Sequence, residues 1–107
     1  MSEEIGVTLN LPSGLDPETA RLVHLFAEAL GRKLYKAQQK YGYRNGWAMD
    51  NWETECRAQL RAHMRKGDPR DVAAYCAFMW RHGWSTSASA AAIRRAERIE
   101  AENANVR

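Results

Sequence analysis

The first apolar residues of the chain fall on every second position, at Ile5, Val7, Leu9 and Leu11. This period of two is typical of an extended strand with one apolar face. Nothing later in the chain supplies a strand to pair with it, because the remaining apolar residues recur at helical spacing. We therefore expect residues 1–14 to form an extended arm that lies across the helices or pairs with another chain.

A long pattern with spacings of three and four follows the arm. Its apolar positions are Val23, Phe26, Ala27, Leu30, Leu34, Ala37 and Tyr41. Asp16 is a favoured N-cap residue, and Pro17 suits the first helical turn. Gly42 follows the last apolar position, as glycine does at many helix ends. The pattern predicts an amphipathic helix over residues 16–41.

A second helical pattern begins near Asp50. Asp50 and Glu53 have the spacing of a capping box, in which an N-cap side chain and the residue three positions later satisfy free backbone amides. The expected buried stripe follows, at Trp52, Cys56, Leu60, His63 and Met64. Gly67 comes next, so the pattern predicts a helix over residues 50–66.

A third pattern starts at Asp68 and Pro69, which repeat the signal of a cap followed by proline. It predicts a helix over residues 69–82. Within it, the segment 72–82 is apolar on nearly every face, which is typical of a helix covered on all sides. We therefore expect this segment to be the central helix of the fold and Trp80 to be buried.

A last pattern is weaker than the others. The serines and threonine of residues 85–87 offer an N-cap, and the sequence predicts a helix over residues 87–102. Its apolar stripe is thin, consisting of Ala92, Ile93, Ala96 and Ile99. We expect this helix to pack loosely or to dock on a partner.

These patterns predict a mainly α fold in a single domain, residues 1–107. About four helices pack around the central apolar helix 72–82, and a short N-terminal extended arm precedes them. The length suits one domain, and a content of 45% hydrophobic and 27% charged residues is ordinary for a folded chain. Because the arm and the last helix each look incomplete alone, the sequence also predicts a homodimer.

The net charge is +3 and the sequence pI is about 9.1. This favours contact with an acidic protein surface, but the chain lacks the dense basic stripe of a DNA-binding protein, so we do not expect direct DNA binding. No stretch approaches the ~20 apolar residues that cross a membrane. Cys56 and Cys76 fall on apolar faces, where we expect reduced core thiols. We therefore expect a cytoplasmic protein with no membrane contact.

Aromatic and basic residues are interleaved through the second half of the chain. The sequence contains four tryptophans, which is more than the packing of so small a core usually demands. Such residues can stack on a partner while arginine contacts its negative groups. We predict a binding surface, with no cofactor, that consists of Tyr43, Arg44, Trp47, Arg57, Arg61, Arg81 and Trp84.

Two pairs of carboxylates have an alternative interpretation. They are Asp50 with Glu53 and Asp68 with Asp71. Four such oxygen ligands could hold Mg²⁺ and support binding or hydrolysis of a nucleoside triphosphate. Each pair also has the spacing of an N-cap residue and a first-turn residue, where acidic side chains stabilise a helix. We favour the capping interpretation and keep the metal site as the alternative.

The segment KYGYRNGWAMDNWETECRAQLRAHMRKGDPRDVAAYCAFMWRHGWST, residues 40–86, resembles one found in small phage and prophage accessory proteins. In some of these it stands beside a dATP/dGTP pyrophosphohydrolase domain of the MazG-like type. That family's activity implies Mg²⁺-dependent hydrolysis of deoxynucleoside triphosphates by an EExxE helix and a later ExxD helix. The nearest equivalents here are the two carboxylate pairs, and no second glutamate adjoins the first pair in the family's register.

The resemblance implies a phage-type protein acting in the host cytoplasm. Short helical phage proteins commonly bind host factors, and no complete catalytic motif stands in this chain. We therefore expect a non-enzymatic interaction protein that binds a host protein or nucleoprotein complex, in host takeover or counter-defence. The alternative is Mg²⁺-dependent binding or pyrophosphohydrolysis of deoxynucleoside triphosphates.

Overall fold

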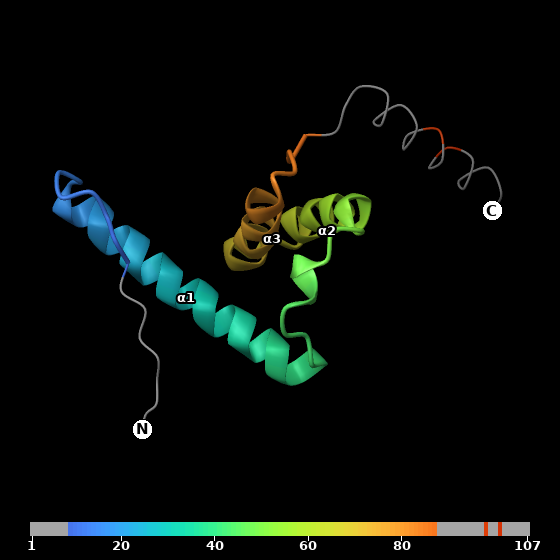
Figure 1. Ribbon diagram of the computed structural model, residues 1–107, viewed down its shortest axis with the longest axis horizontal. Helices are drawn as coiled ribbons and strands as arrows, with labels where there is room; N and C mark the ends of the chain where they lie inside the picture. The colour runs from blue at the N-terminus through green and yellow to red at the C-terminus, as the bar shows by residue number, and fades with distance from the viewer. Residues whose placement is uncertain (1–8, 88–97, 99–100, 102–107) are drawn as a thin grey trace.

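The computed structural model describes residues 9–87 together with Arg98 and Ala101. Its helices are α1 (Pro17–Tyr41), α2 (Glu53–Lys66) and α3 (Pro69–His82), and a short 3-10 helix, η1 (Gly46–Ala48), lies between α1 and α2 (Figure 1). The described part contains no strand, which confirms the prediction of a mainly α fold. Residues 1–8 of the predicted arm lie outside the described residues, as does the predicted helix 87–102 apart from residues 87, 98 and 101.

The ends of α1 follow from local sequence, as predicted. The Asp16 carboxylate accepts hydrogen bonds from the backbone N–H groups of Glu18 and Thr19, at 3.0 and 3.2 Å. Pro17 occupies the first turn, where its missing N–H costs no helical hydrogen bond. At the other end Gly42 adopts a left-handed backbone with φ of 78°, and its N–H donates to the carbonyl of Gln38. Gly67 and Gly83 end α2 and α3 in the same way.

The start of α2 differs from the prediction. The helix begins at Glu53, Trp52 occupies the N-cap position, and no side chain there makes a capping hydrogen bond. Asp50 therefore lies before the helix and does not cap it. The physical reason is that the Trp52 indole N–H donates to the carbonyl of Trp47 at 3.1 Å and its ring packs on the core, which holds Trp52 in a non-helical conformation.

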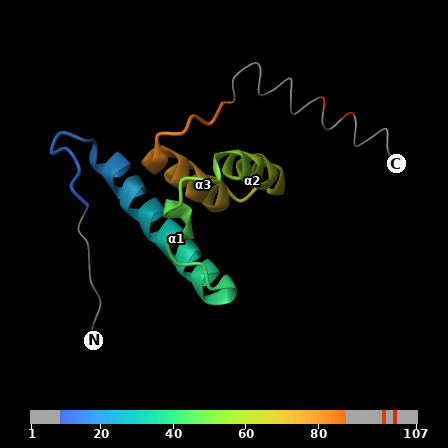
Figure 2. The same ribbon diagram turned by 45° about the vertical axis from the view of Figure 1, so that its right-hand side comes forward.

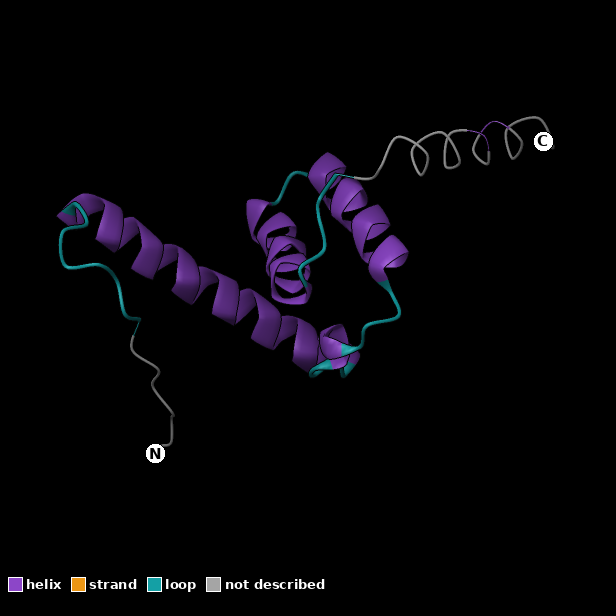
Figure 3. Cartoon of the chain, turned by 45° about the horizontal axis from the view of Figure 1, so that its top comes forward, coloured by secondary structure: helices purple, strands orange, loops and turns teal. Residues whose placement is uncertain are grey.

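Helices α2 and α3 form a hairpin that contains the main core (Figure 3). Cys56 and Leu60 of α2 meet Met79 of α3, and all three are buried. Partly buried side chains surround them, namely Trp52, Val72, Tyr75, Phe78 and Trp84. The short connection through Gly67 brings the end of α2 next to the start of α3, so the two helices run back along each other.

Helix α1 packs on α3 and makes no comparable contact with α2 in the described part of the chain. None of its residues is fully buried. Its C-terminal half lies beside the α2–α3 hairpin, whereas its N-terminal half extends past it (Figures 1 and 2). The predicted apolar stripe of α1 is therefore covered over only part of its length.

Helix α3 contacts α1, α2 and η1, which agrees with a central position for the segment 72–82. The expectation that it is covered on all sides is wrong. Ala74 and Met79 are buried, but Trp80 is 81% exposed, and Cys76 and Ala77 are also exposed. Because α1 and α2 pack on two sides of α3, a third side stays open in the structure described.

Candidate functional site

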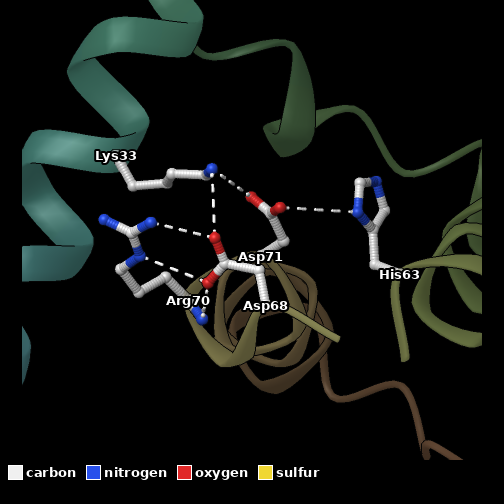
Figure 4. Close-up of polar contacts among 5 residues, drawn as sticks. All are labelled: Lys33, His63, Asp68, Arg70 and Asp71. Carbon is white, nitrogen blue, oxygen red and sulfur yellow. Dashed lines mark hydrogen bonds and ion pairs between the residues drawn. The ribbon is translucent and has the colours of Figure 1, made fainter. Parts of the chain in front are cut away.

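A polar cluster at the start of α3 joins all three helices (Figure 4). The Lys33 ammonium of α1 lies 3.4 Å from an oxygen of Asp68 and 3.4 Å from an oxygen of Asp71. Arg70 contacts Asp68 with its guanidinium at 2.9 Å. On the other side, Nδ1 of His63 on α2 lies 3.7 Å from the second oxygen of Asp71. The cluster therefore holds the two carboxylates between basic groups.

The electrostatics of Asp68 follow from its partners. The side-chain hydrogen bonds from Arg70, with the backbone N–H of Arg70 next, hold the pKa of the Asp68 carboxyl well below its usual range. The same contact raises the pKa of the Arg70 guanidinium. Since the carboxylate accepts a capping N–H at 2.9 Å, it acts as the N-cap of α3, as predicted. Its role in this geometry is structural.

The four candidate Mg²⁺ ligands do not meet at one point. Asp50 and Glu53 lie at the start of α2, while Asp68 and Asp71 lie at the start of α3, beyond the end of α2. Helix α2 has 14 residues, so it separates the pairs by about 20 Å. Glu53 is paired with Arg57 at 2.8 Å. Among the described residues no three His, Cys, Asp or Glu side chains are grouped so as to hold a metal ion.

Two aromatic residues of the predicted binding surface pack against other rings of the fold and are not free to contact a partner with their whole surface. Trp47 is half-buried and stacks on Phe78, with ring centroids 5.8 Å apart. Trp84 is also half-buried, and it stacks on His82 at 4.0 Å. His82 in turn donates from Nε2 to the carbonyl of Trp47 at 2.6 Å. These rings close the end of the hairpin where η1 meets α3.

Of the other residues of the predicted surface, one is engaged within the fold and the rest are exposed. Arg57 is engaged within the fold, because its side chain is only 13% exposed and donates to the carbonyl of Ser85 at 2.8 and 3.2 Å. Tyr43 is exposed and stacks on Tyr41. The other three predicted residues are exposed, namely Arg44, Arg61 and Arg81. Four of the seven predicted residues therefore present their side chains to solvent.

The structure adds Trp80, which the sequence placed in the core. It lies on the open side of α3 together with Ala73, Cys76, Ala77 and Arg81, and these five residues are here called the α3 outer face. Positions 73, 76, 77 and 80 share one side of a helix. The sequence does not show that this side is left open, because α3 is apolar on nearly every side.

A second exposed apolar feature lies on α1. A shallow groove is lined by Leu22, Val23, Phe26, Ala27 and Leu30, here called the α1 groove. Leu22 is 64% exposed, and Val23 and Phe26 are exposed as well. The sequence predicted this stripe but not that it would be left open, because the pattern does not show how far α3 reaches along α1.

The two cysteines also have different surroundings. Cys56 is buried and Cys76 is exposed, so the expectation that both lie in the core is wrong for Cys76. Burial raises the pKa of the Cys56 thiol, which keeps it in the protonated, unreactive form. Both are free thiols.

Comparison with known proteins gives no relative from which a role can be carried over. No family model, no curated protein and no solved structure matches the chain. Within the part that the structure describes, no helix is long and apolar enough to cross a membrane. The candidate sites therefore rest on the geometry of the chain itself.

Proposed function

We propose that this chain is a small, phage-type, non-enzymatic interaction protein that binds a host protein through the α3 outer face. The observation that carries the proposal is the exposure of Trp80, at 81% of its surface. Tryptophan is among the residues that contribute most to binding when a partner buries them, because its ring buries about 150–250 Å². The exposure of so large an apolar ring therefore favours the interpretation that a partner covers this surface.

The neighbours of Trp80 make the face accessible. Ala73, Cys76 and Ala77 have small side chains, so a partner can approach the indole closely. A pocket in the partner that accepts the ring would exclude water from it, and this is the usual arrangement at the centre of an interface. The face thus combines one large aromatic side chain with small side chains around it.

The charge of the face indicates the chemistry of the partner. Arg81 stands beside Trp80, and the only acidic residue of α3, Asp71, is held by Lys33 on another side of the helix. The whole chain carries a net charge of +3. An acidic host protein surface with an apolar pocket therefore complements the α3 outer face.

The alternative, Mg²⁺-dependent hydrolysis of deoxynucleoside triphosphates, has less support. It needs Asp50, Glu53, Asp68 and Asp71 around one metal, and the length of α2 separates the two pairs. Lys33 and Arg70 also occupy the positions beside Asp68 that a cation would take. The geometry favours binding over catalysis.

The test is capture of bacterial host proteins by purified wild-type protein and by Trp80→Ala. We expect the variant to lose at least about 30-fold in affinity for the captured protein, the loss typical of an anchor tryptophan. Tyr35→Ala is the matched control, because Tyr35 is 58% exposed but lies on α1. Equal capture by Trp80→Ala and wild type would contradict the proposal. So would pyrophosphate release from a deoxynucleoside triphosphate with Mg²⁺ that Asp71→Asn abolishes.

A further inference from the structure

Positive charge is concentrated at the C-terminal end of α1 and in the loop that follows it (Figure 1). All 13 acidic residues of the chain lie outside residues 29–49, whereas this segment contains five basic residues, namely Arg32, Lys33, Lys36, Lys40 and Arg44. Lys33 is engaged with Asp68 and Asp71. The other four are exposed, and among the described residues none of them is paired with a carboxylate. The small net charge of the whole chain therefore conceals a strongly basic region.

Three of these basic residues form a row along the helix. Arg32, Lys36 and Lys40 are four positions apart, so each lies about 6 Å further along α1 than the one before it. A stacked nucleic acid strand repeats its phosphates about every 3.4 Å. The spacing of the three side chains therefore suits contact with every second phosphate of one strand.

Two exposed tyrosines lie at the end of this row. Tyr41 and Tyr43 stack on each other with ring centroids 5.5 Å apart, yet they remain 57% and 68% exposed. The Lys40 ammonium lies 5.2 Å from the centroid of the Tyr41 ring. Arg44, which is exposed, follows Tyr43 directly. Exposed aromatic rings among cations can stack on a base while the cations contact the neighbouring phosphates.

We infer that this region binds single-stranded nucleic acid, in addition to the proposed binding of a host protein through the α3 outer face. It is here called the α1 basic surface and consists of Arg32, Lys36, Lys40, Tyr41, Tyr43 and Arg44. A single strand offers phosphates to the basic row and an open base face to the tyrosines. The bases of a duplex are already stacked on one another, and an acidic protein surface has carboxylates but no regularly placed planar groups.

The experiment measures fluorescence anisotropy of labelled oligothymidine and oligouridine, each of about 12 nucleotides, with the purified full chain. Four cations on a single strand predict that log K falls with log salt with a slope of about −3, a loss of about 50-fold between about 50 and 200 mM salt. Tighter binding of one oligonucleotide would identify DNA or RNA as the preferred strand. Absence of binding to both at about 50 mM salt would overturn the inference.

Two substitutions separate the phosphate contacts from the base contact. Lys36→Gln is expected to reduce the steepness of the salt dependence by about 0.7, the contribution of one phosphate contact. Arg65→Gln is the matched control, because it removes one exposed positive charge from α2 and should leave the slope unchanged. Tyr43→Ala is expected to weaken binding at least about fivefold, whereas Tyr43→Phe, which keeps the ring, should bind as the wild type does.

Other ligands of the α1 basic surface give distinct results. Equal or tighter binding of a duplex, or of a polyglutamate peptide, at the same salt concentration would overturn the inference. So would equal affinities of Tyr43→Ala and Tyr43→Phe. Trp80→Ala is expected to bind the oligonucleotides as the wild type does, and Tyr43→Ala to capture the host protein from nuclease-treated extract as the wild type does. Failure of this inference and failure of the proposed function can therefore be told apart.

Discussion

Met79 and Trp80 are consecutive residues of α3, yet Met79 is fully buried and Trp80 is 81% exposed. Successive residues of an α-helix differ by about 100° in direction, so one points into the hairpin while the next points into solvent. Hydropathy cannot rank these two positions, because α3 is apolar in both directions. Only the number and placement of the neighbouring helices decides which side is covered.

The burial of Met79 predicts a large effect of its removal. Met79→Ala deletes a side chain that packs on Cys56 and Leu60, so we expect it to lower the free energy of unfolding by about 2–5 kcal/mol. Met64→Ala is the matched control, since Met64 is 61% exposed on α2, and its effect should stay within about 0.5 kcal/mol. Urea unfolding followed by circular dichroism measures both. Equal losses in the two variants would contradict the assigned core.

At the scale of whole elements, the sequence predicts those helix ends that interactions between neighbouring residues determine. The N-caps Asp16 and Asp68, and Gly42 and Gly67 at the ends of α1 and α2, are predicted from neighbouring residues in the chain, and the structure confirms them. The start of α2 was missed, because the Trp52 side chain bonds to the Trp47 carbonyl instead of leaving Asp50 to cap the helix. Such a contact depends on how a loop folds, and no spacing rule encodes it.

The candidate sites likewise depend on contacts between residues that are far apart in the chain. Each carboxylate pair has a spacing that allows either metal binding or capping. In the structure Asp68 caps α3 and lies beside Lys33, whereas Asp50 does not cap α2. Lys33 is 35 residues from Asp68 in the chain, so the sequence alone does not reveal the contact. The α1 groove and the α3 outer face were likewise hidden, because both arise where one helix fails to cover another.

The ion pairs of Asp68 with Arg70 and Lys33 predict that stability depends on acid. Because the pKa of Asp68 is lowered in the folded chain, its ion pairs stabilise the fold above the ordinary carboxyl pKa and are lost as the pH falls below about 4. Asp68→Asn keeps a residue that caps a helix but removes the charge opposite Lys33 and Arg70. We expect its Tm to lie below that of the wild type at pH 7, with the gap narrowing as the pH falls from about 4 towards 2.

Thermal unfolding between pH 7 and pH 2 measures this gap. Asp16→Asn is the matched control, because Asp16 caps α1 through the backbone N–H groups of Glu18 and Thr19. It should show a smaller gap at pH 7 than Asp68→Asn. A difference in Tm for Asp68→Asn that stays constant down to pH 2 would show that the ion pairs of Asp68 do not stabilise the fold.

For the molecule as a whole, the described fold is extended and its core is small. The radius of gyration is 17.5 Å and the longest dimension is 55 Å, whereas a compact chain of about 100 residues has a radius near 13 Å. Four hydrophobic residues are buried in the described part, namely Cys56, Leu60, Ala74 and Met79. A domain with so little buried surface is only marginally stable alone, and it gains from any partner that covers its exposed apolar residues.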